Sequence, residues 1–197
     1  MEVVAKQERS QKRIDSIVDA AVQIIESEDI NALSLAKVAE ISGLKRTSTY
    51  KFIPTVNTLK ELVIIKCIDE CVDCFDNDLN KLDLDVDILK VTNFIVTVIF
   101  DFFVNSLVSQ KLILGYTINP PLNSKCIHKL GSAIEETYER NININDVFNK
   151  AGVCRVIAQI ILSVFSLNTK ESGTLNDVGK IEATRAATAY LESWIKK

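Results

Sequence analysis

The chain has 197 residues, of which 47% are hydrophobic and 25% are charged, and its formal net charge is -3. This composition is ordinary for a globular protein, and the length allows a small domain followed by a medium one. With only six glycines and three prolines, the chain has too few turn residues for many tight strand connections, which favours long helices.

Neither the N-terminal segment nor the most apolar run of the sequence predicts export or membrane insertion. The N-terminus is polar and charged, unlike a secretory signal. The run Phe94–Phe103 is interrupted by Thr97 and Asp101, and we expect it to be too short and too polar to span a bilayer. Without a secretory signal, the five cysteines are expected to be reduced thiols. We therefore expect a cytoplasmic protein with no membrane partner.

The charges are distributed unevenly along the chain. Residues 1–60 carry nine Lys or Arg against eight Asp or Glu, whereas residues 61–197 carry 14 against 18. Within residues 37–60 there are five cations and a single anion, Glu40. The only clearly basic stretch is therefore short, but it could neutralise a few phosphates of a nucleic acid.

The spacing of apolar side chains predicts an all-α protein. In the first helix Ile17, Ala21 and Ile24 lie on one face, as burial of one side requires. The helix that begins near residue 86 is apolar almost all round, which is typical of a central buried helix. No segment alternates with a period of two. The predicted helices span residues 13–28, 35–41, 45–52, 55–80, 86–108, 124–140, 146–167 and 175–196.

Capping and turn residues mark the ends of the first three helices. The polar residues 1–12 are expected to be frayed. Ser34 is a suitable N-cap for the second helix, and Gly43 can adopt the left-handed conformation that a tight turn needs. Pro54 ends the third helix. We place a domain boundary there, which gives domains of residues 1–54 and 55–197.

The second and third helices, with the glycine between them, form the pattern of a helix-turn-helix. Val38 and Leu44 are placed to pack against the first helix, and Ala39 is small where two helices must approach closely. The third helix then exposes side chains that can contact phosphates and base edges in a major groove. Two surface helices joined by a glycine turn are also common in proteins that do not bind DNA.

Over residues 13–62 the sequence resembles the TetR (tetracycline-repressor) family of transcriptional regulators. The matching segments are Ile17–Val22, Leu35–Leu44, Ser48–Pro54 and Leu59. The resemblance implies an all-α fold with an N-terminal three-helix DNA-binding domain and a C-terminal helical domain for ligand binding and dimerisation. It also implies a homodimer that binds double-stranded DNA at a palindromic operator and represses transcription. Carried over by position, the DNA-binding residues are Ser34, Lys45, Arg46, Thr47, Ser48, Tyr50 and Lys51.

Some positions depart from the family pattern. Lys45 stands where a small capping residue is usual, and Thr49 replaces an aliphatic residue. Phe52-Ile53 replace His or Tyr followed by Phe, and Thr55-Val56 stand where a Lys is common. These departures leave the operator sequence unpredicted. They also keep open a second function, that of a protein-interaction module such as a coactivator adaptor or a division inhibitor.

The last two predicted helices are rich in apolar residues. Their alanines permit close approach, and Tyr190 and Trp194 are large side chains of the kind favoured at interfaces. The resemblance implies that these helices form a four-helix bundle between two copies of the chain; the alternative is that they pack only on their own core. The predicted dimer contacts are Ile157, Ile161, Val164, Phe165, Ala187, Tyr190 and Trp194.

A narrow polar stripe runs along the apolar helix predicted over residues 86–108. Its members, Asn93, Thr97 and Asp101, are four residues apart. These side chains either orient a small, mostly apolar ligand or mark the solvent side of the helix. The resemblance implies a ligand in this domain that shifts the helix predicted over residues 55–80. The predicted ligand-binding residues are Cys67, Cys71, Asn93, Thr97, Phe100 and Asp101.

Cysteines on the fourth predicted helix offer a further alternative. Cys67, Cys71 and Cys74 share one helix face, and Cys126 lies two residues from His128. They could bind zinc or sense thiol oxidation in a repressor of the same architecture, or they could fill core as small apolar side chains. A single C-x-x-C is a weak metal signal, so no metal or other cofactor is predicted. Catalysis is not expected, because the chain has one histidine and no nucleophile, zinc or phosphate-loop motif.

Overall fold

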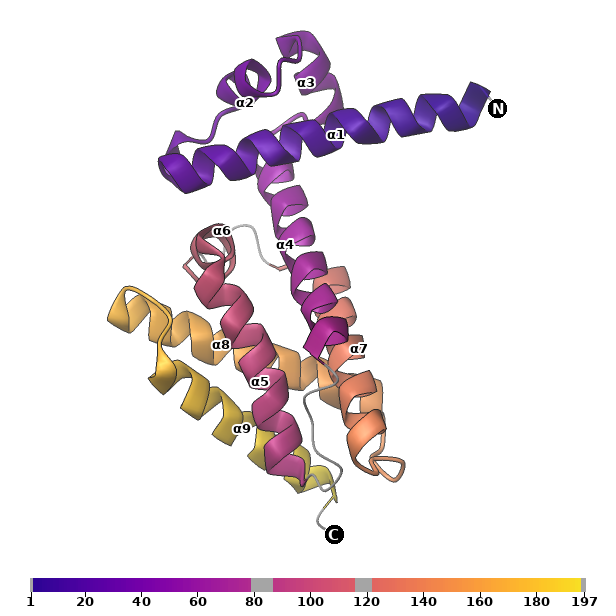
Figure 1. Ribbon diagram of the computed structural model, residues 1–197, viewed down its shortest axis with the longest axis vertical. Helices are drawn as coiled ribbons and strands as arrows, with labels where there is room; N and C mark the ends of the chain where they lie inside the picture. Colours follow the sequence, from indigo (N-terminus) through magenta and orange to yellow (C-terminus); the bar gives the residue numbers. More distant parts are fainter. Residues whose placement is uncertain (1, 79–86, 116–121, 196–197) are drawn as a thin grey trace. The chain divides into compact units, whose positions relative to one another are not determined.

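The computed structural model describes residues 2–78, 87–115 and 122–195, with side chains described from residue 7 to 75 in the first of these ranges. The described residues are almost entirely helical and contain no strand (Figure 1), which confirms the predicted all-α class. The elements are α1 (Glu2–Ser27), the 3-10 turn η1 (Ile30–Ala32), α2 (Leu35–Ile41), α3 (Arg46–Phe52), α4 (Val56–Asp78), α5 (Ile88–Asn105), α6 (Leu107–Ser109), the π-helical turn η3 (Gln110–Leu114), α7 (Ser124–Asn141), α8 (Lys150–Ser172) and α9 (Asp177–Ile195).

The chain forms two compact units, Met1–Ile64 and Ile65–Lys197. The boundary lies within α4, about ten residues after the boundary that we place at Pro54, because the first turns of α4 belong to the N-terminal unit. The last two residues of the helix predicted over 55–80 lie outside the described residues.

The N-terminal unit is built on α1, α2 and α3. Ile17, Ala21 and Ile24 of α1 are fully buried, as their spacing predicts, and Val38 of α2 is buried with them. The helix α1 begins at Glu2 and not near residue 13. The segment before residue 13 has no glycine or proline and is rich in Ala, Lys, Gln, Glu and Arg. These residues favour helix, so the helix continues beyond the part that faces the core.

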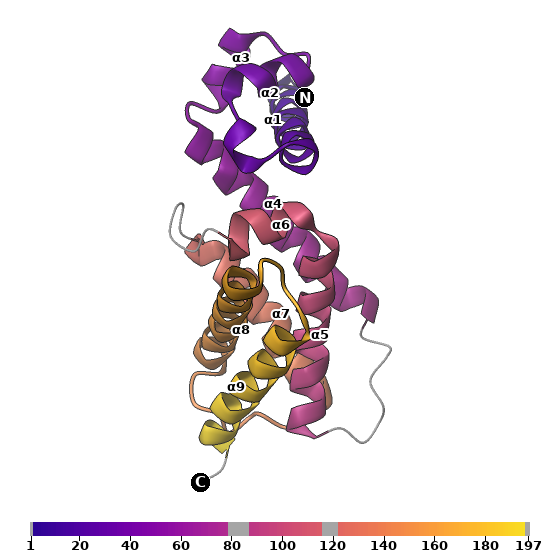
Figure 2. The same ribbon diagram turned by 90° about the vertical axis from the view of Figure 1, so that its left-hand side faces the viewer.

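In the second unit α8 packs against both α7 and α9, and α5 packs against α9 (Figure 2). Phe165 of α8 meets Phe100 and Phe103 of α5 edge to face, with ring centroids 6.0 Å and 6.4 Å apart. The buried hydroxyls of Thr92 and Tyr138 lie 2.7 Å apart and join α5 to α7 by a hydrogen bond. This bond satisfies two polar groups that would otherwise be costly to bury.

Two described helices, α5 and α8, are long and apolar enough to cross a membrane by length and composition alone. The run Phe94–Phe103, which we expect to be too short, lies within the 18 residues of α5. Of the most apolar windows of α5 and α8, 44% and 50% are buried inside the fold, as central helices of a folded domain are.

Several predicted boundaries in the second unit shift for local reasons. The helix predicted over residues 86–108 ends at Asn105, because Ser106 has an extended backbone and its side chain accepts a hydrogen bond from the amide of Ser109. The penultimate helix begins at Lys150 and not at 146, since Asn149 is its left-handed N-cap. It continues to Ser172, where Gly173 takes the left-handed conformation that ends it.

Candidate nucleic-acid interface

Capping and one ion pair fix the helix α2. The side chain of Ser34 caps it by accepting a hydrogen bond from the amide of Lys37, 3.3 Å away. The ammonium of Lys37 pairs with Glu28 just beyond the end of α1. Gly43 has a φ of 68°, and this left-handed turn sends the chain into α3 without a side-chain clash.

One face of α3 is anchored in the N-terminal unit. Thr49, where the family has an aliphatic residue, is fully buried, and its hydroxyl donates to the carbonyl of Lys45, 3.4 Å away. Ile53 is also fully buried. The guanidinium of Arg13 lies 5.9 Å from the centroid of the Phe52 ring, a cation–π contact that joins α1 to the end of α3.

The opposite face of α3 is exposed and polar. Arg46, Thr47 and Lys51 are exposed, Tyr50 is 49% exposed, and Ser48 is half-buried. Of the residues predicted to bind DNA, the structure thus brings the members on α3 together on one surface.

Lys45 and Ser34 complete the predicted set at the helix starts. Lys45 precedes α3 as its N-cap residue, and its side chain is exposed. Within the described part of the chain, no ion pair involves Lys45, Arg46 or Lys51. Hydroxyls and unpaired cations on an exposed helix are suited to phosphate oxygens and base edges.

Most of the predicted dimer contacts are core residues. Ile157, Ile161 and Phe165 of α8, and Ala187 of α9, are fully buried within a single chain, so they cannot touch a second copy. This corrects the prediction for these four residues. Phe165 meets two rings of α5, and α8 and α9 pack against each other within the same chain.

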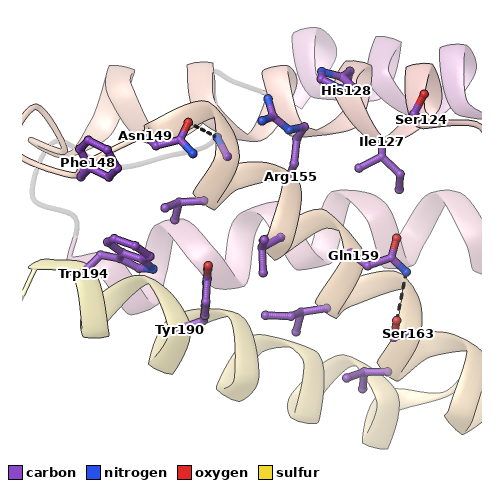
Figure 3. A pocket seen from close by; sticks show the side chains of 15 residues that line it. Ser124, Ile127, His128, Phe148, Asn149, Arg155, Gln159, Ser163, Tyr190 and Trp194 are labelled. Atoms are coloured by element: carbon purple, nitrogen blue, oxygen red, sulfur yellow. Dashed lines mark hydrogen bonds between the residues drawn. The ribbon is translucent and has the colours of Figure 1, made fainter.

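The remaining three predicted contacts line an open groove. Val164 and Tyr190 are half-buried and Trp194 is 39% exposed. Figure 3 shows this groove between α7, α8 and α9, with Tyr190 and Trp194 on the α9 side and His128 and Arg155 on the other. Its volume is about 870 Å³. Its apolar lining residues are Ile127, Phe148, Val153, Val156, Ile160, Val164, Tyr190 and Trp194.

The predicted ligand-binding residues do not form one site. Asn93 and Asp101 are exposed and Thr97 is half-buried, so the stripe marks the outer side of α5. The hydroxyl of Thr97 is already used, since it donates to the carbonyl of Asn93, 2.7 Å away. The other three, Cys67, Cys71 and Phe100, are buried. The partial exposure of Thr97 and the exposure of Asp101 therefore agree with the solvent-face interpretation of the stripe.

Replacing Asp101 by alanine is accordingly expected to change little. The side chain is exposed, and such surface substitutions usually alter stability by less than about 0.5 kcal/mol. Thermal unfolding and DNA affinity of the Asp101→Ala protein should match those of the unmodified chain. A loss of DNA release by an active inducer would instead restore Asp101 to a ligand site.

Asn93 lies at a second groove, between α5 and α9. Its volume is about 480 Å³, and its apolar walls include Leu89, Ile181 and Ala189. The hydroxyl of Thr188, also in its lining, is buried without a hydrogen-bond partner among the described residues. This groove does not follow from the sequence pattern, because it needs the α5–α9 packing, which joins segments far apart in the chain.

The cysteines lie mostly in the core of the described part of the chain. Among the described residues none of the five forms a disulfide, and all but Cys74 are buried. Burial raises the pKa of Cys67 to about 11 and that of Cys154 to about 12, and it also raises the pKa values of Cys71 and Cys126. Because the thiolate is the reactive and metal-binding form, these environments favour thiols that fill core. No group of three or more His, Cys, Asp or Glu among the described residues could hold a metal.

No protein-family model and no curated protein matches the sequence, but solved structures match nearly its whole length. A TetR transcriptional regulator from Rhodococcus sp. RHA1 has a TM-score of 0.69 at 12% identity, covering 94% of this chain and 97% of that one. A TetR-family transcriptional regulator from Streptomyces coelicolor has a TM-score of 0.64 at 14% identity, covering 92% and 99%. The TetR family repressor AlkX from Dietzia sp. strain DQ12-45-1b, implicated in biodegradation of n-alkanes, has a TM-score of 0.60 at 15% identity, covering 93% and 98%. The chain therefore has the fold of the TetR-family transcriptional regulators.

Proposed function

We propose that the protein is a sequence-specific DNA-binding transcriptional regulator, and that it acts as a homodimeric, ligand-responsive repressor in the cytoplasm. One observation carries the proposal: α3 presents hydroxyls, Tyr50 and unpaired cations on one exposed face, while its other face is anchored by buried Thr49 and Ile53. A helix held in this way can enter a major groove as a rigid body. The solved structures with the same fold are regulators of this class, which supports the proposal.

Selection of bound duplexes from a random library by the full chain tests the proposal. We expect a palindromic consensus, with half-sites about 34–36 Å apart or a multiple of that spacing, as two recognition helices of a dimer require. A parallel selection with the Lys125→Ala protein should give the same consensus, because Lys125 is an exposed residue of α7. If no duplex is enriched even at low salt, the protein-interaction function becomes the better account.

The outer groove between α7, α8 and α9 supports the proposed homodimer. Phe148, which precedes α8, and Val156 of α8 line this groove and are 79% and 41% exposed. Leu167, also on α8, is 57% exposed. Covering so much exposed apolar surface would be favourable. Two copies would also bring two sets of α3 cations to one duplex, which compensates for a chain whose net charge is -3.

A charge placed in this groove is expected to separate the copies. Val156→Glu would bury a carboxylate in the contact, which is costly without a partner. Sedimentation equilibrium should show monomers where the unmodified chain gives dimers. Val104→Glu is a matched control, because Val104 of α5 is 43% exposed against 41% for Val156 and does not line this groove. Equal association of both variants, or a monomeric unmodified chain, would contradict the proposed interface.

We further propose that a small, mostly apolar ligand controls DNA binding and occupies the groove between α5 and α9. Its volume, about 480 Å³, lies in the usual range for small-molecule sites, which combine apolar walls with polar groups. Leu89, Ile181 and Ala189 supply the apolar walls here, and the lining also carries Lys180, Arg185 and Glu192. Release of DNA requires that the ligand bind the DNA-free conformation more tightly.

Dodecane and dodecanoic acid are suitable probes of this groove. Release of the selected duplex by either probe should be lost in the Ile181→Glu protein and kept in the Val178→Glu protein. Release that survives Ile181→Glu would place the ligand elsewhere.

A further inference from the structure

The N-terminal half of α1 extends beyond the core of its unit. From Gln7 to Ser16 no side chain is buried, whereas Ile17, Ala21 and Ile24 are fully buried. A helix of 26 residues is about 39 Å long at the usual rise per residue. Figure 1 shows this end of α1 running on past α2 and α3. The core of the unit therefore does not explain why the helix is so long.

This exposed half carries its cations on one side. Arg9, Lys12 and Arg13 are all exposed, and helical geometry places them within about 100° of one another. Glu8 and Asp15 lie beside Lys12 at the edge of this side, four residues before it and three after it, and Asp15 accepts a hydrogen bond from the side-chain amide of Gln11, 2.8 Å away. In the part of the chain with described side chains, no ion pair involves Arg9, Lys12 or Arg13. We call these three residues the α1 cationic face.

The α1 cationic face lies beside the recognition helix. The guanidinium of Arg13 is 5.9 Å from the ring centroid of Phe52, the last residue of α3, and Lys51 is the neighbour of Phe52. The four cations of α1 lie between Lys6 and Arg13, whereas Asp15, Asp19 and Glu26 are the charged residues that follow them in the helix. The N-terminal part of α1 is therefore its more positive part, and Arg13 places it next to α3, which we propose to contact DNA.

We infer that the α1 cationic face is a second DNA contact, which binds the phosphate backbone flanking the base pairs that α3 reads. The inference rests on the proposed function. Residues 1–60 have nearly balanced charge, so attraction to phosphates must come from a local surface, and this face adds three cations to those of α3. Long cationic side chains such as these suit phosphate oxygens, and contacts to phosphates carry no sequence information.

The test compares the salt dependence of binding to the selected duplex for the full-length unmodified chain and three variants of it. Arg9→Gln with Lys12→Gln removes two cations per chain, and Lys125→Gln with Arg140→Gln removes the same charge from exposed positions on α7. Each phosphate contact contributes about 0.9 to the slope of log affinity against log salt. For a dimer we expect the first variant to lower the slope by about 3 to 4 and to bind about tenfold or more weakly. The second variant should leave the slope and the affinity unchanged. The charge-conserving variant, Arg9→Lys with Lys12→Arg, should have the slope and the affinity of the unmodified chain.

The outcomes separate this inference from the proposed function. An unchanged consensus with a reduced slope supports a phosphate contact by the α1 cationic face. If the unmodified chain binds its duplex and the Arg9→Gln, Lys12→Gln protein binds with the same affinity and slope, this inference alone is wrong. If the unmodified chain binds no duplex, both the inference and the proposed function are wrong.

Discussion

Replacing Phe165 by alanine is expected to lower the free energy of unfolding of the second unit by about 3–5 kcal/mol. Phe165 is fully buried and meets Phe100 and Phe103 edge to face, so its removal leaves a cavity and also removes aromatic contacts. Urea unfolding followed by circular dichroism measures the loss. It should appear as a lower midpoint at every protein concentration.

The same experiment distinguishes a core residue from an interface residue. Phe148→Ala removes the same side chain from a position that is 79% exposed. That variant should weaken association in sedimentation experiments and leave the unfolding of the single chain nearly unchanged. If Phe165→Ala instead weakens association without lowering the unfolding midpoint of the monomer, the interface role predicted from the sequence would be restored.

Replacing Lys51 by alanine is expected to weaken binding to every duplex by a similar factor, because a cation on phosphate contributes no sequence information. In a dimer two contacts are lost, so the slope of log affinity against log salt should fall by about 2. Fluorescence anisotropy over a range of salt concentrations, with the selected duplex and a scrambled one, measures both effects. Lys125→Ala serves as the control, since it removes an exposed lysine of α7. A Lys51→Ala protein with unchanged affinity and slope would show that this ammonium does not contact DNA.

The N-terminal helices could be predicted from the sequence because their signals are local. Ser34, Gly43 and Pro54 each act on the backbone within a few residues, and the predicted range of α2 agrees with the structure. The length of α1 was missed because the prediction followed the buried stripe, which begins near Ile17. Before residue 13 no described side chain of α1 is buried, so helix formation there depends mainly on residue propensity, which leaves no apolar stripe in the sequence.

The roles of residues in the second unit depend on packing between distant segments. A stripe such as Ile157, Ile161 and Phe165 shows that one face of α8 is covered, but not whether the cover is α9 of the same chain or a second copy. Polar residues four apart, such as Asn93 and Thr97, can face solvent as well as a ligand. The exposed face of α3 was predictable because its opposite face is fixed by nearby residues, including Thr49 and Ile53.

A second duplex selection with the Tyr50→Ala protein tests directly whether the exposed face of α3 reads base sequence. Tyr50 is 49% exposed in the middle of that face, so its loss should remove or change preference at symmetric positions of both half-sites. Positions of the half-site that other side chains read should keep their base preference. The account predicts a consensus altered at those positions, beside an unaltered consensus for Lys125→Ala. The same consensus, enriched to the same degree by Tyr50→Ala and by the unmodified chain, would contradict it.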